Sequence, residues 1–66
     1  MRNILKDERA KLNLTQQDLA DKVGVSRQTI NSIEASRYVP STILSIKISK
    51  IFKTTVNEIF LLEKDD

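Results

Sequence analysis

Residues 15–34, TQQDLADKVGVSRQTINSIE, decide the fold of this 66-residue chain. Thr15 and Asp18 have the spacing of a capping box, in which each residue's side chain accepts a hydrogen bond from the other's backbone amide. This pattern predicts a helix that begins at Thr15. Gly24, the only glycine in the chain, follows this helix and predicts a left-handed turn, a conformation in which a side chain would clash.

A second helix is predicted only three residues later, after Gly24-Val25-Ser26. Ser26 is expected to cap it, and it extends to about Ala35. Two short helices with so tight a connection predict a helix-turn-helix over residues 15–36. The residues expected to fill the angle between the helices are small or apolar: Leu19, Ala20, Val23, Val25, Ile30 and Ile33.

Three further helices are predicted around this unit. The first covers about residues 3–11, the fourth covers residues 42–52 with Ser41 or Thr42 as its cap, and the fifth begins after Thr54 or Thr55. Residues 61–66 form either a frayed turn or a short strand. The fourth helix carries an apolar stripe with helical spacing: Leu44, Ile48, Ile51 and Phe52. We therefore predict an all-α fold of five helices, with residues 1–66 as one domain.

Composition excludes several classes of function. The chain has no cysteine and no histidine, which excludes disulfides, the usual zinc sites and the Ser-His and Cys-His nucleophile pairs. A domain of this size has little room for an enclosed substrate pocket. We therefore predict no catalytic residues, metal, cofactor or small-molecule ligand. With only short apolar runs and no signal sequence, the chain is expected to be a soluble cytoplasmic protein without membrane contact.

The charges are unevenly distributed along the chain, although the net charge is only +2. Residues 22–53 contain six lysines and arginines against one acid, whereas residues 54–66 contain four acids against one lysine. A basic middle and an acidic tail favour a polyanionic partner such as nucleic acid. Ordinary solvated charges remain the alternative at this point.

The segments TQQDLADKVGVSRQTINSIE and ASRYVPS resemble the Xre family, also called the phage Cro and repressor family. The likeness extends from Leu5 to Phe60 and is strongest to compact single-domain members. It implies a lambda-repressor-like fold and a DNA-binding transcriptional regulator of a prokaryote or phage, located on the nucleoid when bound. Ser36 stands where the family often has glycine, and Lys53-Thr54 replace a common glycine and valine.

The helix after Gly24 is expected to enter the major groove of double-stranded DNA. Arg27 can donate to guanine O6 and N7, and Gln28 or Asn31 can pair with adenine. In the family, the positions that match Arg27, Gln28 and Ser32 read bases. The alternative is a merely solvated helix face, so base reading requires exposed Arg27 and Gln28 side chains that do not bond to their own chain. The predicted base contacts are Arg27, Gln28, Asn31 and Ser32.

Phosphate contacts are expected on either side of this helix. In the family, the glutamine that matches Gln16 bonds a phosphate, and the pair that matches Arg9 and Glu34 forms a structural ion pair. The ring of Tyr38 could instead cover the core beneath Pro40. The predicted phosphate contacts are Thr15, Gln16, Ser26, Thr29, Arg37 and Tyr38.

A homodimer is expected, because so small a domain without disulfides usually needs a further source of stability. The recognition helices of a dimer lie about 34 Å apart on DNA, so the interface should lie on the far side, in residues 54–66. Its predicted residues are Val56, Asn57, Phe60, Leu61 and Leu62. Alternatively, these side chains fill the monomer core. The predicted function is a homodimeric repressor on a palindromic operator, and the alternative is an antitoxin-like interaction module that also binds its own promoter.

Overall fold

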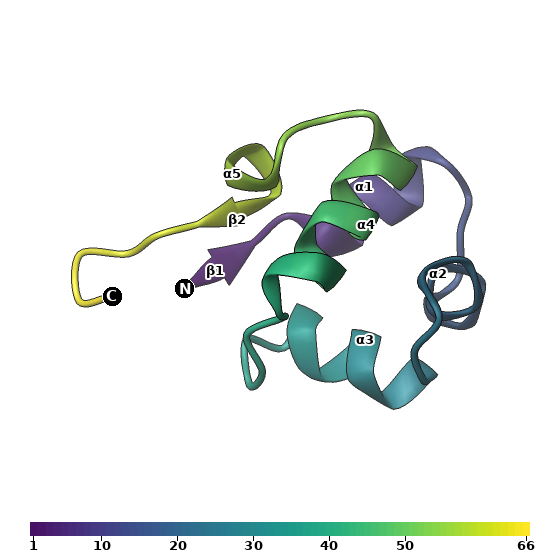
Figure 1. Ribbon diagram of the computed structural model, residues 1–66, viewed down its shortest axis with the longest axis horizontal. Helices are drawn as coiled ribbons and strands as arrows, with labels where there is room; N and C mark the ends of the chain where they lie inside the picture. The colour runs from purple at the N-terminus through teal and green to yellow at the C-terminus, as the bar shows by residue number, and fades with distance from the viewer.

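The computed structural model describes residues 1–66 and contains five helices and one two-stranded sheet (Figure 1). This confirms the predicted all-α class and the predicted number of helices. No helix is long and apolar enough to cross a membrane. The elements in chain order are β1 (Arg2–Asn3), α1 (Leu5–Lys11), α2 (Gln16–Val23), α3 (Arg27–Glu34), α4 (Thr42–Phe52), α5 (Val56–Ile59) and β2 (Phe60–Leu61).

Local signals fix the two central helices where the sequence predicts them. Thr15 and Asp18 form both hydrogen bonds of the capping box at the start of α2. Gly24 ends α2 in the left-handed conformation, with φ of 78°. The Ser26 hydroxyl accepts from the amide of Thr29 and thereby caps α3. α2 and α3 pack closely against each other, which completes the predicted helix-turn-helix.

The two ends of the chain differ from the prediction because they pair with each other. β1 and β2 are antiparallel, with Arg2 opposite Leu61 and Asn3 opposite Phe60. α1 therefore begins at Leu5, two residues later than predicted, and α5 is a single turn. The side chain of Asn3 also donates to the carbonyl of Ile33, at 2.9 Å, and so connects the sheet to the end of α3.

One core of ten buried apolar residues joins all five helices and β2. Phe60 belongs to this core with an exposed fraction of only 6%. This corrects the prediction that its side chain is part of a dimer surface, because a partner could contact little of it. The core residues are Leu5, Leu19, Ala20, Val23, Ile30, Ile33, Leu44, Ile48, Ile59 and Phe60.

Three non-glycine residues adopt left-handed backbone conformations where helices end. They are Asn13 with φ of 55°, Ser36 with φ of 60° and Lys53 with φ of 55°. Ser36 and Lys53 are two of the positions where the sequence departs from the expected glycine. The backbone turn is therefore kept without glycine, at a cost of roughly 1–2 kcal/mol per residue.

Candidate nucleic-acid interface

α3 has one buried face and one exposed face. Ile30 and Ile33 are buried in the core, with exposed fractions of 0% and 1%, while Arg27 and Gln28 are exposed at the start of the helix. Ser32 is half-buried on the next turn. α3 lies along one side of the molecule, and the terminal sheet and α2 lie at opposite ends of the long axis (Figure 1). The predicted base-reading edge is thus open to solvent.

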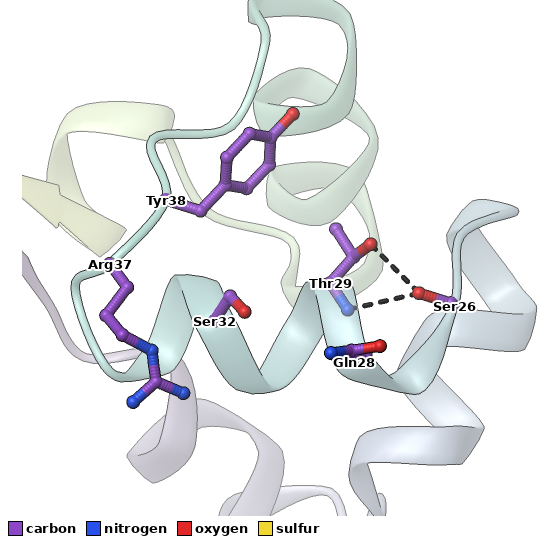
Figure 2. Close-up of a pocket in the computed structure, with 6 residues that line it drawn as sticks. All are labelled: Ser26, Gln28, Thr29, Ser32, Arg37 and Tyr38. Atoms are coloured by element: carbon purple, nitrogen blue, oxygen red, sulfur yellow. Dashed lines mark hydrogen bonds between the residues drawn. The ribbon is translucent and has the colours of Figure 1, made fainter.

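An open depression of about 280 Å³ lies between α3 and the loop that follows it (Figure 2). Tyr38 faces Thr29 and Ser32 across this depression, and Arg37 lies at its loop end. Tyr38 is 48% exposed whereas Pro40 is buried, so the core beneath the loop is covered by Pro40 more than by the tyrosine ring. All six lining residues were predicted to contact DNA: Ser26, Gln28, Thr29, Ser32, Arg37 and Tyr38.

The ion pair that the family resemblance implied is present beneath this surface. Arg9 on α1 donates from Nε and Nη2 to the two carboxylate oxygens of Glu34 at the end of α3. Arg9 also donates to the carbonyl of Leu14 at 2.8 Å. The hydrogen bond with Glu34 raises the pKa of Arg9. Because the Arg9 and Glu34 side chains are only 13% and 8% exposed, the pair fixes α3 to α1 without facing solvent.

A series of side-chain hydrogen bonds connects Glu34 to the exposed face of α3. The Nε2 of Gln16 donates to Glu34 at 3.1 Å. The Oε1 of Gln16 accepts from Nδ2 of Asn31 and from Nη1 of Arg27, both at 3.4 Å. The Oδ1 of Asn31 accepts from Nη2 of Arg37 at 3.1 Å. Gln16 and Asn31 therefore use both the oxygen and the NH2 group of their amides in hydrogen bonds within the chain.

This arrangement was missed in the sequence, and it separates the four predicted base contacts. Gln28 forms no side-chain hydrogen bond within the chain, and Arg27 forms one that lies beyond the usual 2.7–3.2 Å range and is therefore weak. Both meet the requirement for exposure, and only Gln28 is wholly unengaged. Asn31 is half-buried and engaged at both ends, by Arg37 at 3.1 Å and by Gln16 through an equally weak bond of 3.4 Å. The only feature of the sequence that pointed to these hydrogen bonds was the four-residue spacing of Arg27 and Asn31, which places them on the same face of α3.

The remaining predicted residues lie at two places, the start of α2 and the terminal region. Thr15 is exposed at the start of α2, where first-turn amides lack acceptors within the helix. The two ends of the chain, residues 1–4 and 54–66, form what we call the terminal region. In it Asn57 and Leu62 are exposed, whereas Val56 and Leu61 are half-buried. No group of three or more acidic, histidine or cysteine residues could hold a metal ion.

Comparison with known proteins gives consistent matches over nearly the whole chain. A family model described as helix-turn-helix matches residues 5–59. An uncharacterized HTH-type transcriptional regulator of Methanocaldococcus jannaschii is 53% identical over 66 residues, which cover 100% of both chains. The uncharacterized HTH-type transcriptional regulator YgzD of Bacillus subtilis is 41% identical over the same full lengths. The ImmF control region 10 kDa protein of Bacillus phage phi105 is 32% identical over 60 residues, covering 91% of this chain and 67% of the phage protein.

Proposed function

The chain belongs to the Xre-like helix-turn-helix family and is a transcriptional regulator with a helix-turn-helix DNA-binding domain, and from this premise we propose that it is a repressor that binds a palindromic operator as a homodimer. The observation that carries this proposal is the depression beside α3. It brings residues proposed to read bases and residues proposed to hold phosphates to one open surface. The same surface can therefore bind the phosphates of a DNA strand and contact its bases.

We assign base reading to the exposed start of α3. The major groove is about 12 Å wide and admits an α-helix. Arg27 has the paired donors that suit guanine O6 and N7, and the amide of Gln28 has the donor and acceptor that suit adenine. Ser32, one turn beyond Gln28, is short and can contact only a base that approaches closely. The weak hydrogen bond to Gln16 uses only Nη1 of Arg27, so Nε and Nη2 stay free to donate to a base.

We assign phosphate binding to the groups around this edge. Arg37 and the Tyr38 hydroxyl approach from the loop, and Ser26 and Thr29 lie at the start of α3. At the start of α2, Thr15 and the backbone amides of the first turn offer donors at the positive end of a helix dipole. The Gln16 side chain is already bonded at both ends, so a phosphate here is better served by the Gln16 backbone amide.

We propose that the dimer forms through the terminal region without the Phe60 side chain. Leu62 is 80% exposed and follows half-buried Leu61 in the chain, and α5 contributes half-buried Val56 and exposed Asn57. The longest extent of the monomer is 31 Å, while recognition helices of a dimer lie about 34 Å apart. A two-fold axis at the terminal end fits this spacing better than one beside α3. A dimer seated on an operator would repress by blocking access to the promoter.

Selection of bound sites from a random duplex library tests this function. We expect the protein to select a palindrome and to lose affinity steeply as salt rises, because phosphate contacts release counterions. Arg27→Ala should relax one position of each half-site, with a loss of discrimination of about 1–3 kcal/mol. Arg2→Ala, which removes an exposed arginine on β1, is the matched control and should leave base choice unchanged. Equal binding to all duplexes by the unmodified protein would contradict sequence-specific regulation.

A further inference from the structure

We propose that Asn31 is a positioning residue, which fixes the guanidinium of Arg27 through Gln16 and thereby sets base choice at the Arg27 position without itself contacting DNA. This inference rests on the proposed function, since it concerns how the same surface reads DNA. It changes the role of Asn31, which the sequence predicted as a reader of bases. It also gives Arg37 a second role beside phosphate binding.

Three side-chain hydrogen bonds connect Arg37 to Glu34 through Asn31 and Gln16. Arg37 donates to Asn31 at 3.1 Å, Asn31 donates to Gln16 at 3.4 Å, and Gln16 donates to Glu34 at 3.1 Å. All three bonds thus run the same way, from a cation to an anion. Bonds arranged in one direction polarise and strengthen one another.

The two charged ends determine how both amides are oriented. A guanidinium can only donate and a carboxylate can only accept, so the oxygen of Asn31 must face Arg37 and the NH2 group of Gln16 must face Glu34. Reversal of the Asn31 amide would place its NH2 against the donors of Arg37. Reversal of the Gln16 amide would place its oxygen against the carboxylate of Glu34. Only one orientation of each amide satisfies both neighbours.

Arg27 is held by the oxygen that this orientation presents. Arg27 and Asn31 are four residues apart on α3, so they occupy neighbouring places on the same helix face. Both donate to the same Oε1 of Gln16. Glu34 is itself held by Arg9 through two hydrogen bonds, so the acceptor that Arg27 meets is fixed from the protein interior. Loss of Asn31 removes one of the two anchors on that amide.

Base reading by Asn31 is disfavoured by the same bonds. A bidentate contact with adenine needs both the oxygen and the NH2 group of the amide. Those are the two groups that Asn31 uses for Arg37 and Gln16. To reach a base, half-buried Asn31 would have to release both partners. Gln28, which has no such bonds and is exposed, is the better reader.

The test compares base preference at every operator position for the unmodified protein, Arg27→Ala, Asn31→Ala and the double variant. Asn31→Ala should relax the position that Arg27→Ala relaxes, by about 3- to 10-fold. The double variant should relax that position no further than Arg27→Ala alone. Relaxation of a different position would show that Asn31 reads a base itself. Equal weakening on all duplexes would show a merely structural role, and either result would overturn the proposal.

Two further variants test whether Asn31 affects Arg27 through Gln16. Lys50→Ala removes an exposed side chain from α4, outside the proposed DNA and dimer surfaces, and should leave all base preferences unchanged. Asn31→Asp keeps an acceptor for Arg37 but cannot donate to Gln16. If the link runs through Gln16, Asn31→Asp should relax the Arg27 position as Asn31→Ala does. Retention of full preference in Asn31→Asp would overturn the proposed route.

A measurement without DNA separates this inference from the proposed function. The NMR order parameter of the Arg27 Nε–Hε group reports side-chain motion on the ps–ns timescale. It should fall in Asn31→Ala and stay constant in Lys50→Ala. If the protein selected no operator, the proposed function would fail, and this measurement would still decide whether Asn31 positions Arg27. An unchanged order parameter in Asn31→Ala would contradict the inference directly.

Discussion

The helix-turn-helix and the terminal region are stabilised in different ways, although each is built from short elements. In residues 15–34, each cap satisfies a backbone group within three positions, as Thr15 does for Asp18 and Ser26 for Thr29. The terminal region depends on pairing between the first and last residues of the chain. The amide of Ile4, for example, donates to the carbonyl of Ile59 at 3.0 Å. The two helices of the helix-turn-helix are therefore locally encoded, while the terminal region requires the complete fold.

The sharpest test of this difference uses two neighbouring apolar residues of the terminal region. Phe60 is 6% exposed and Leu62 is 80% exposed. Phe60→Ala should lower the free energy of unfolding by about 3–5 kcal/mol, because it leaves a cavity in the core. Leu62→Asp should leave the monomer folded but dissociate the proposed dimer. Urea unfolding at fixed protein concentration and sedimentation velocity measure the two effects.

Ile43→Asp serves as the control for dimerisation, because Ile43 is 70% exposed on α4 and lies outside the proposed interface. It should stay dimeric. If Leu62→Asp also stayed dimeric, the interface would have to be placed elsewhere. If Phe60→Ala had the same urea midpoint as the unmodified protein, the Phe60 side chain would not contribute to the stability of the core.

The same difference explains how far the sequence predicted the structure. The capping box, the turn at Gly24 and the three-residue connection each depend on residues close together in the chain, and all were predicted correctly. β1 was missed, because two residues are too few for an alternating pattern and their partners lie at the other end of the chain. For the same reason, the apolar character of Phe60 did not distinguish a core residue from an interface residue.

The candidate site was predicted in its residue types but not in its internal bonds. Helical spacing predicted that Arg27 and Gln28 are exposed, as they are in the structure. Their side-chain chemistry then made them the candidates for base reading. The engagement of Asn31 depends on where α2 places Gln16 and where the loop places Arg37. Neither place can be deduced from helical spacing, because both follow from how separate elements pack. The DNA contacts themselves stay predictions.

Helix-ending turns give a second, smaller contrast between the two regions. Gly24 and Lys53 both adopt left-handed conformations, with φ of 78° and 55°. A Cβ at Gly24 would meet nothing within 4 Å, so Gly24→Ala should cost only the conformational penalty, roughly 1–2 kcal/mol. Lys53→Gly should stabilise by roughly 0.5 kcal/mol, because relief of strain exceeds the added entropy of the unfolded chain.

Thermal unfolding followed by circular dichroism measures both changes in the same buffer. Lys50→Gly provides the matched control, since Lys50 is a helical residue of α4 with no positive φ. It should destabilise by about 0.5–1 kcal/mol, which is opposite in sign to Lys53→Gly. Destabilisation by Lys53→Gly would mean that the lysine side chain contributes more than its backbone conformation costs.

The smallest expected effect concerns the charge of the capping box. Hydrogen bonds from the backbone amide and the hydroxyl of Thr15 lower the pKa of Asp18. The folded pKa thus lies below the unfolded value of about 3.9, so the ionised carboxylate stabilises the folded state. This contribution is complete above about pH 5 and is lost as pH falls through the unfolded and then the folded pKa. Asp18→Asn keeps an oxygen acceptor for Thr15 but removes the charge.

The free energies of unfolding of the unmodified protein and of Asp18→Asn, measured in urea, should therefore differ by a constant amount between pH 7 and 5. The two curves should converge as the pH is lowered further, because protonated Asp18 then resembles asparagine. Asp65→Asn, in the exposed tail, is the matched control and should leave the free energy of unfolding at pH 7 unchanged. A difference for Asp18→Asn that persisted at pH 2 would mean that the amide disturbs the capping geometry, and that the charge is not what Thr15 stabilises. Convergence would instead show that the charge of Asp18 carries the stabilising effect of this capping box, an interaction contained within four residues.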